Sequence, residues 1–349
     1  MYNFIDEILA KPSDYDWILF GAGVKSAEFY NKYLASGVLP MPKYVVDNNP
    51  EKWGTKWLGN LTIEDPKKVM SEDYKKTVII IATHWLAIVD QLRHMGAYYF
   101  MTITVKSIDD YIFIKDNKDR IDRVESWLSD DLSKELFRTK IEDYRRGVIY
   151  APSCISFNPY YGNDVIPNLN DNDVIIAGGC YNCEHIDRAL MINPKIKCYA
   201  FEPNAKYADL LRDKYKDNPN IVVRENGLFN ENVTLLLDNS VDLSAHVVAV
   251  RENEPINENA ETIKAVKLDD ADVNDATLIW MDIEGSEVLA LKGAENLIKK
   301  NRPKLAICVY HLIEHYVEVA ECIKEFNPDY KLYFRHHTTM DLDSVLYAI

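Results

Sequence analysis

Long apolar runs and an excess of basic residues are both missing from this sequence of 349 residues. No run reaches the roughly 18 apolar residues that indicate a transmembrane helix, so the sequence predicts no membrane span. Lys and Arg total 40 against 55 Asp and Glu, which gives a formal net charge of −15 at pH 7. This charge repels phosphate backbones and anionic lipid surfaces, and we expect neither nucleic acid nor a membrane as a partner.

Cysteine is scarce for a chain of this length, with six residues. So few thiols do not suggest the disulfide framework of a small secreted protein. Residues 1–7 also lack the basic and apolar regions of a signal peptide. We therefore expect a cytoplasmic, reducing location and a small-molecule or glycan substrate. A homo-oligomer is compatible with the sequence, which does not determine the oligomeric state.

The length favours two domains. In residues 1–115, short apolar runs at 17–20, 44–47 and 77–82 alternate with helical patterns, which predicts a small Rossmann-like N-terminal domain. Residues 116–150 are charged and carry apolar side chains at helical spacing, so we expect a helical connector. Residues 151–349 would form the second domain.

The second domain shows the alternation of strands and helices that demands a mostly parallel, doubly wound α/β sheet. The expected parallel strands are residues 174–177, 196–201, 221–223, 278–282 and 305–310. Residues 233–237 and 245–250 predict an antiparallel insertion. Residues 330–336 and 344–349 predict a terminal hairpin that adds an antiparallel edge strand.

Three carboxylates lie within six residues where the strand at 278–282 should end: Asp282, Glu284 and Glu287. Burying unpaired carboxylates costs several kcal/mol, so a core has no use for them. Ligands of open α/β sheets bind at the carboxyl ends of the strands. The segment is therefore predicted to form the edge of an active site.

The second domain resembles the FkbM family of O-methyltransferases, a group of class I methyltransferases that use S-adenosylmethionine. An ordered series of segments carries the resemblance: YAFEPN at 199–204, ENGL at 225–228, VKLDD at 266–270, MDIEGSE at 281–287, ALKGA at 290–294, PKLAI at 303–307 and VYH at 309–311. The resemblance covers roughly residues 150–349. It implies methyl transfer to a hydroxyl group of a sugar or glycan.

The resemblance also implies which residues face the cofactor. Glu202, at the end of a strand, would accept the ribose hydroxyls, although an acid there could instead stabilise the next helix. Gly178 and Gly179 would let the backbone approach the methionine moiety. The full set of expected cofactor-binding residues is Gly178, Gly179, Cys180, Glu202, Pro203, Asn226, Gly227 and Asp282.

Asp282 is the first choice for a catalytic residue near the transferred methyl group. His311 ends the next strand and is a candidate general base, with a histidine bonded to backbone as the alternative. His246 is a second candidate base. Glu284 is expected to shape the acceptor edge, and with Asp282 it could hold a divalent cation through oxygen ligands.

Two positions depart from the family pattern. Ala177 stands where relatives usually carry an acid, and Cys183 stands where they carry a third glycine. These departures motivate an alternative, a methyltransferase-like binding module that has lost its cofactor. Cys180 and Cys183 also form a Cys-x-x-Cys pattern at a helix start, which is compatible with redox or metal chemistry, although two small buried thiols are the favoured interpretation.

Other patterns are weaker. In the first domain, Gly21 and Gly23 with Asp47 form a partial dinucleotide fingerprint, for which a nucleotide-sugar or scaffolding role is favoured over nicotinamide binding. Tyr160 and Trp280 could stack on a sugar, but such aromatics more often belong to a core.

Overall fold

The computed structural model describes residues 5–83, 85–147, 158–238, 246–249, 261–340 and 342–349. The chain divides into two compact units, one of Met1–Asp116 with Ile141–Val148 and one of Asn117–Lys140 with Ile149–Ile349. The boundary between the units falls within a helix, and the expected domain limits stay predictions. No helix in the described part of the chain is long and apolar enough to cross a membrane.

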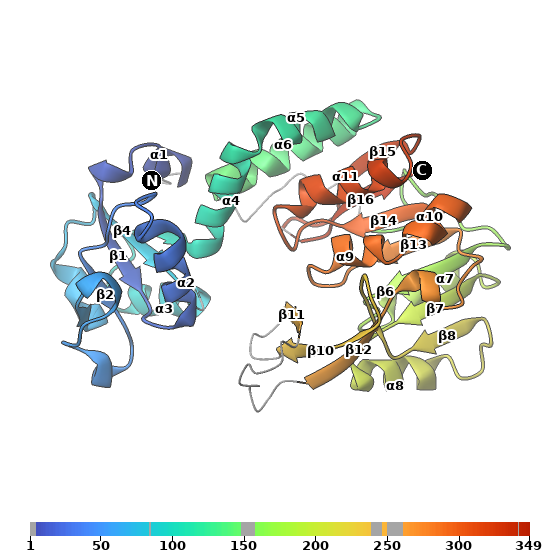
Figure 1. The fold of residues 1–349 in the computed structure, drawn as a ribbon, viewed down its shortest axis with the longest axis horizontal. Coiled ribbons are helices and arrows are strands. Elements are labelled where there is room, and N and C mark those ends of the chain that lie inside the picture. The colour runs from blue at the N-terminus through green and yellow to red at the C-terminus, as the bar shows by residue number, and fades with distance from the viewer. Residues whose placement is uncertain (1–4, 84, 148–157, 239–245, 250–260, 341) are drawn as a thin grey trace. The chain divides into compact units, whose positions relative to one another are not determined.

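The first unit is built on a five-stranded parallel sheet with the strand order β3-β2-β1-β4-β5 (Figure 1). Its strands are β1 Asp16–Phe20, β2 Tyr44–Val46, β3 Ile63–Glu64, β4 Thr77–Ile81 and β5 Met101–Thr104. Its helices are α1 Ile5–Ala10, α2 Val24–Phe29, the π-helical turn Tyr30–Leu34, α3 Trp85–His94 and α4 Val105–Asp116. The β-branched strands are buried on both faces, as parallel strands between helices require. This confirms the predicted Rossmann-like arrangement.

Asp47, the acid of the partial fingerprint, holds its own loop together. Its carboxylate accepts the backbone N–H of Ala22 at 2.8 Å and of Asn49 at 2.8 Å, and pairs with Lys52 at 3.0 Å. These donors outweigh the effect of burial and lower the pKa of Asp47. The geometry favours the scaffolding interpretation of this acid.

The second unit contains a seven-stranded sheet with the order β15-β16-β14-β13-β6-β7-β8. Its strands are β6 Val174–Gly178, β7 Lys197–Phe201, β8 Ile221–Arg224, β13 Leu278–Met281, β14 Lys304–Cys308, β15 Leu332–His336 and β16 Ser344–Ala348. Strand β16 alone runs antiparallel, between β14 and β15. The expectation of an antiparallel edge strand is therefore wrong: the antiparallel strand lies inside the sheet, because β16 returns between β14 and β15, and β15 forms the edge.

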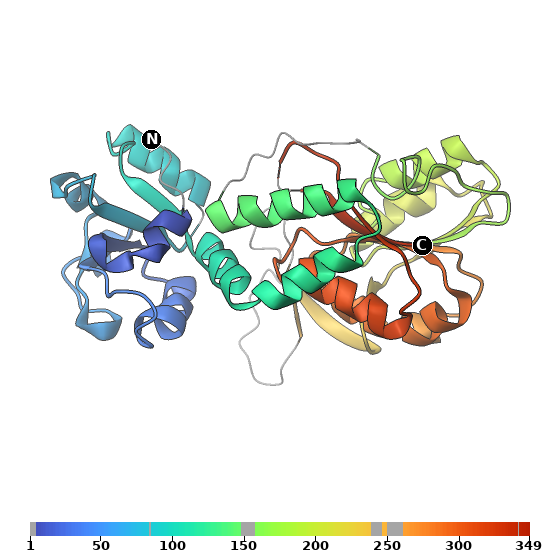
Figure 2. The same ribbon diagram turned by 90° about the horizontal axis from the view of Figure 1, so that it is seen from above.

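Helices cover the seven-stranded sheet, as Figure 2 shows. They are α7 Glu184–Ile192, α8 Ala205–Lys214, α9 Glu287–Lys292, α10 Glu295–Asn301 and α11 His315–Phe326. Short 3-10 helices lie at Leu268–Asp270 in this unit and at Pro12–Asp14, Pro50–Lys52, Leu58–Asn60 and Pro66–Ser71 in the first unit. On one face of the sheet, Trp280 stacks on Tyr160 with ring centroids 4.6 Å apart, and both side chains are fully buried. Tyr160 and Trp280 are thus core residues rather than a sugar platform.

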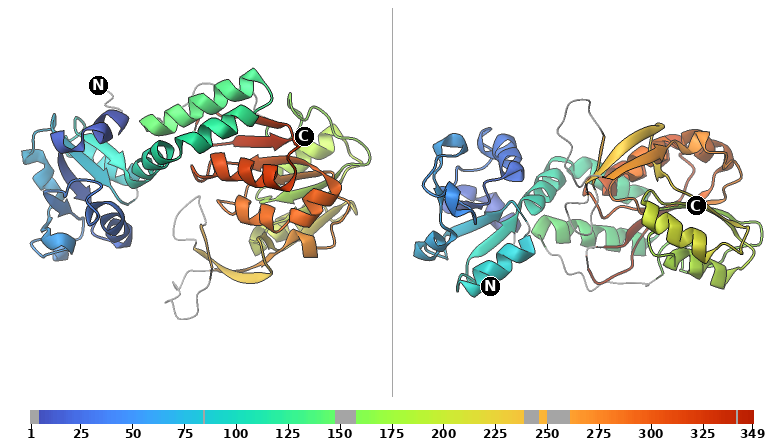
Figure 3. Two further views of the ribbon diagram at one scale, coloured as in Figure 1. Left: turned by 45° about the horizontal axis from the view of Figure 1, so that its top comes forward. Right: turned by 90° about the horizontal axis from the view of Figure 1, so that it is seen from below.

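A separate small sheet has the order β11-β10-β12-β9. Its strands are β9 Gly227–Leu228, β10 Val233–Asp238, β11 His246–Ala249 and β12 Glu261–Val266 (yellow to orange in Figure 3). Strands β10 and β11 pair antiparallel, which confirms the predicted insertion within the described residues. Strands β9 and β12 were not expected from the sequence.

Two helices form a hairpin, α5 Lys118–Trp127 and α6 Asp131–Arg146. The side chain of Arg335 in β15 ties the start of α6 to the sheet, and it is only 3% exposed. Its guanidinium donates to Asp130 at 2.8 Å, to Asp164 at 2.7 Å and to the Ser133 hydroxyl at 2.8 Å. This network anchors segments far apart in the sequence.

We expect Arg335→Met to lower the free energy of unfolding by about 2–3 kcal/mol, because two carboxylates lose a buried partner. Asp130 and Asp164 stay partly exposed, which keeps the loss below that of a fully buried pair. Urea denaturation followed by circular dichroism measures the change. Arg212→Met is the control, since this exposed arginine pairs only with Asp209 and Glu225 and should cost about 0.5 kcal/mol or less.

Candidate active site

Asp282 follows β13 directly, at the carboxyl end of the sheet. Its backbone N–H donates to the carbonyl of Gly178 at 3.0 Å, so the chain leaves β13 beside the end of β6. The turn that follows needs left-handed backbone at Glu284, with φ of 55°, and at Gly285, with φ of 95°. Glycine adopts such values freely, whereas a glutamate there carries strain.

Two tyrosine hydroxyls hold the carboxylate of Asp282. Tyr160 donates to Oδ2 at 2.9 Å and Tyr310 donates to Oδ1 at 2.9 Å. The nearest cationic group is His311, whose Nε2 lies 3.4 Å from Oδ1. The sequence suggested neither tyrosine as a partner of Asp282. Tyr160 is more than a hundred residues away along the chain, and no motif around it indicates this contact.

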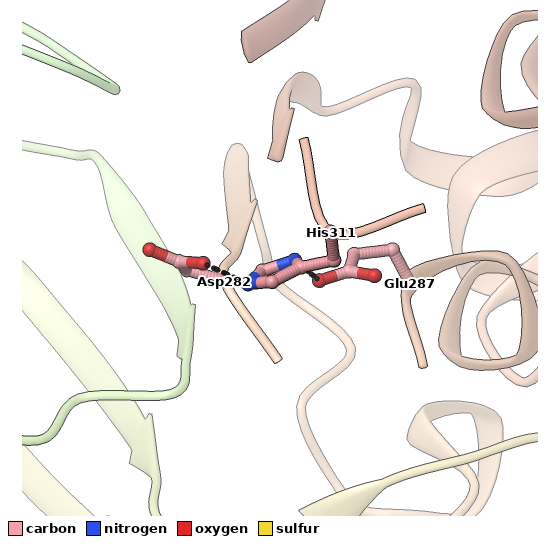
Figure 4. Close-up of side chains that lie close together, drawn as sticks. All are labelled: Asp282, Glu287 and His311. Carbon is pink, nitrogen blue, oxygen red and sulfur yellow. Dashed lines mark ion pairs between the residues drawn. The ribbon is translucent and has the colours of Figure 1, made fainter. Parts of the chain in front are cut away.

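His311 lies between carboxylates, as Figure 4 shows for Asp282 and Glu287. Its Nδ1 is 3.0 Å from Glu287, and its Nε2 is 3.4 Å from both Asp282 and Glu284. Burial alone would lower the pKa of His311, but the adjacent Glu287 carboxylate and the charges of Asp282 and Glu284 raise it to about 9. The structure thus brings together Asp282, Glu284 and His311, three residues predicted from the ends of adjacent strands.

Negative charge exceeds positive charge at this edge. Burial raises the pKa of the half-exposed Glu284. Burial and the nearby Asp282 raise the pKa of Asp343, which sequence reasoning missed, to about 6. Asp282, Glu287 and His311 offer ligand atoms within 4.8 Å of one another. The imidazole ring of His311 lies between the carboxylates of Asp282 and Glu287. A divalent cation at this edge therefore stays a prediction.

Glu202 follows β7, which lies on the other side of β6 from β13. The backbone N–H of Tyr181 donates to its Oε2 at 2.9 Å, and that of Asn204 to its Oε1 at 3.0 Å. Burial raises the pKa of Glu202 despite these donors. A carboxylate offers about four acceptor positions, so lone pairs remain for ribose hydroxyls. The residues present therefore fit the cofactor that the sequence implies.

Gly178 ends β6 and Gly179 follows with φ of 80°. A Cβ atom on Gly179 would lie 1.9 Å from the Asp282 carbonyl oxygen, and one on Gly178 would lie 2.9 Å from Leu228. Glycine is thus required where the end of β6 meets the turn after β13. The structure shows a close approach between two loops of the chain at this point. The expected approach of this backbone to the cofactor stays a prediction.

The Cys-x-x-Cys pattern is buried. Cys180 is 2% and Cys183 is 1% exposed, and burial raises the pKa of both thiols. The position at a helix start does not lower the pKa of either thiol, which argues against a reactive thiolate. Cys183 precedes α7 with φ of 71°, the backbone conformation that the glycine of the family pattern would adopt without strain.

The remaining expected cofactor-binding residues follow strands β7 and β8. Pro203 follows Glu202, and its Cβ lies 3.8 Å from the place where a Cβ on Gly227 would be. Asn226 is half-buried in the connection from β8 to β9, and its N–H donates to the Arg224 carbonyl. The side chain of His246 lies outside the described residues.

Strained backbone gathers around the crevice. Of eight non-glycine residues with positive φ in the described chain, five lie at the loops that surround Asp282 and Glu202: Tyr160, Tyr181, Cys183, Glu284 and Asp343. Such conformations cost about 1–3 kcal/mol each and persist where the surrounding contacts enforce them. Their concentration at one edge supports a functional site there.

Residues 178–338 match the family model of the methyltransferase FkbM domain. The whole chain is similar in fold to the crystal structure of Methyltransferase FkbM from Methylobacillus flagellatus KT, with 19% identity, 99% of this chain and 93% of that chain covered, and a TM-score of 0.59. A fibrillarin from Aeropyrum pernix with bound S-adenosyl-L-methionine matches 54% of this chain and 70% of its own, at 11% identity and a TM-score of 0.34. Among curated proteins, none matches the sequence.

We expect Gly179→Ala to lower the free energy of unfolding by about 3 kcal/mol, from left-handed strain together with the clash against Asp282. Gly162→Ala separates the two effects. Gly162 has φ of 70°, but its added methyl would meet only the tip of the Ile192 side chain, so about 1 kcal/mol is expected. If urea denaturation gives equal losses of unfolding free energy for the two variants, the loops after β6 and β13 do not depend on the contact between Gly179 and Asp282.

Proposed function

Because residues 178–338 form a methyltransferase FkbM domain, we propose that the chain transfers a methyl group from S-adenosylmethionine to a hydroxyl group of a sugar or glycan. The observation that carries the proposal is the two-sided edge of the seven-stranded sheet. Glu202 and the Gly178–Gly179 turn form a cofactor side, and Asp282, Glu284 and His311 form an acceptor side.

The charge of the acceptor side supports a neutral, hydroxylated acceptor. Carboxylates accept hydrogen bonds from sugar hydroxyls but repel phosphate and carboxylate groups. Three acids lie at this edge, Asp282, Glu284 and Asp343, and the cationic group beside them is His311. A sugar hydroxyl fits this edge better than an anionic acceptor.

The chemistry that the cofactor supplies when bound is an electrophilic methyl group on a sulfonium. The acceptor oxygen gains the bond to the methyl carbon as the carbon–sulfur bond breaks, and its proton must leave. His311 is the proposed base, through Nε2, in the neutral form that it adopts as the pH rises through its pKa of about 9. Asp282, held by Tyr160 and Tyr310, then stabilises the imidazolium by its charge. The proposal needs no divalent cation, since the imidazolium balances part of the carboxylate charge.

A specific observation also keeps the non-enzymatic alternative open. Both oxygens of Glu202 already accept backbone N–H groups, and Leu228 and Asp282 cover the glycine turn. A chain with this site closed would be a methyltransferase-like binding module. Ala177 is fully buried in an apolar cluster, so an acid restored there would be costly, and Cys183→Gly is the better reversion.

We expect isothermal titration to show one site for S-adenosylmethionine, with a dissociation constant below about 1 mM. Glu202→Gln should weaken binding about tenfold, because charged acceptors make the stronger hydrogen bonds. Glu225→Gln, an exposed acid after β8, is the matched control. No heat at millimolar cofactor would contradict the catalytic proposal. Binding that appears only in Cys183→Gly would establish the module instead.

We expect Asp282→Asn to lower methyl transfer about 100-fold while the affinity for the cofactor stays within about threefold. Asparagine keeps the shape and can still meet both tyrosine hydroxyls, but it has no charge to stabilise the imidazolium. Tritiated S-adenosylmethionine with a panel of methyl glycosides and sugar nucleotides measures the transfer. Asp275→Asn makes the same change at the opposite end of β13, where the acid pairs with Lys197. Native turnover in Asp282→Asn would remove Asp282 from the mechanism.

A further inference from the structure

Tyr181 is a large aromatic side chain that the described part of the chain leaves open to solvent. It lies in the turn between β6 and α7 and is 54% exposed. Its backbone is left-handed, with φ of 40°, a conformation that residues other than glycine rarely adopt. Neither the exposed ring nor the strained backbone stabilises the fold. Strain of this kind is typical of residues that contact a ligand.

Glu202 fixes the backbone of this strained residue. The N–H of Tyr181 donates to Oε2 of Glu202 at 2.9 Å, and Glu202 is only 5% exposed. A hydrogen bond to a buried carboxylate is among the stronger ones in a protein, so it can hold the turn in its strained form. The acid that we expect to accept the ribose hydroxyls therefore also sets the position of Tyr181.

A second tyrosine supports the ring of Tyr181 from the next loop. Tyr207 lies in the first turn of α8, shortly after Glu202. The two rings have centroids 4.5 Å apart, and their planes are tilted by 56°. The contact with Tyr181 raises the pKa of Tyr207, and the charge of Glu202 adds to the rise. Tyr207 is half-buried, so Tyr181 has the more open ring of the pair.

The strand order indicates which part of the cofactor these rings can meet. The order is β13-β6-β7-β8, so β7 and its Glu202 lie beyond β6 from the acceptor side. The transferred methyl group must lie toward β13, where the proposed base is. In S-adenosylmethionine the base and the sulfonium are attached to opposite sides of the ribose. A ribose at Glu202 therefore directs the adenine away from β13, toward the loop after β7 that carries Tyr207.

We propose that Tyr181 stacks on the adenine of S-adenosylmethionine and that Tyr207 is a positioning residue, which holds the Tyr181 ring. The inference rests on the proposed function, because it needs this cofactor. Stacking on an aromatic side chain recognises a base by its flat π-face and needs no hydrogen bond to its edge. Glu202 then acts on both parts of the adenosine, since it accepts the ribose hydroxyls and fixes the ring that covers the base.

Isothermal titration of the full chain tests the proposal with S-adenosylmethionine and S-adenosylhomocysteine. The second probe keeps the adenosine but has no sulfonium charge. We expect Tyr181→Ala to weaken the binding of both probes about tenfold, the loss expected when one stacked base loses its aromatic partner. Tyr207→Ala acts only through the Tyr181 ring and should weaken both about threefold. Tyr181→Phe and Tyr207→Phe keep the rings and should bind within about twofold of the native chain.

Tyr98→Ala is the matched control. Tyr98 is an exposed tyrosine of the first unit, and its ring centroid lies 4.2 Å from that of Tyr99. This variant should leave both affinities unchanged. Unchanged or tighter binding in Tyr181→Ala would overturn the proposal. A loss confined to S-adenosylmethionine would also overturn it, because the ring would then face the sulfonium through a cation–π contact.

A measurement on the native chain does not depend on the folding of an alanine variant. Nuclear Overhauser effects between ¹³C-labelled tyrosine rings and the adenine protons of S-adenosylhomocysteine report the contact directly, and Tyr181→Phe assigns the signal. We expect an effect between Tyr181 and the adenine. Adenine contacts to other tyrosines but none to Tyr181 would overturn the proposal.

The two proposals fail separately. Binding of both probes that does not depend on Tyr181 would defeat the adenine site and leave the methyltransferase proposal intact. Binding that weakens in Tyr181→Ala, without methyl transfer to any of the sugar acceptors, would support the adenine site and contradict the proposed acceptor class.

Discussion

The burial of negative charge at the carboxyl ends of β13 and β14 is the constraint on which the rest of the second unit depends. Each acid there needs donors or cationic partners, and these come from several parts of the chain. Glu287 accepts backbone N–H groups from its own turn and pairs with two histidines, His311 after β14 and His315 at the start of α11. Asp282 takes a hydroxyl from Tyr160, which precedes the whole sheet. Pairing these charges therefore joins loops that strand order alone would leave independent.

Space imposes a second constraint at the same place. Gly179 and the carbonyl of Asp282 approach so closely that no side chain fits between them. The loop after β6 and the loop after β13 are thus in contact through backbone atoms. A change in one loop must displace the other, because protein interiors have little free volume to absorb it. The strained residues around the crevice follow from the same crowding.

Much of the fold could be predicted from the sequence, because strands buried on both faces leave continuous β-branched runs such as residues 77–81. The place of β16 could not. Hydrophobic pattern shows that a strand exists but not which neighbours it pairs with, and β16 pairs with β14 as well as β15. Strand β9 was missed for a related reason, since a two-residue strand has no periodicity to detect. Strand β12 has six residues and was also not predicted.

Asp282, Glu284 and His311 were predictable as a group, because acids and a histidine that directly follow parallel strands meet at one edge of the sheet. The contacts of Glu287 with two histidines were not predicted, although the four-residue spacing of His311 and His315 was a usable signal. The sequence by itself determined which residue types stand at the strand ends. Only the tertiary structure decided which nitrogen of His311 faces which acid, because that depends on contacts of about 3 Å between segments that the chain brings together by folding.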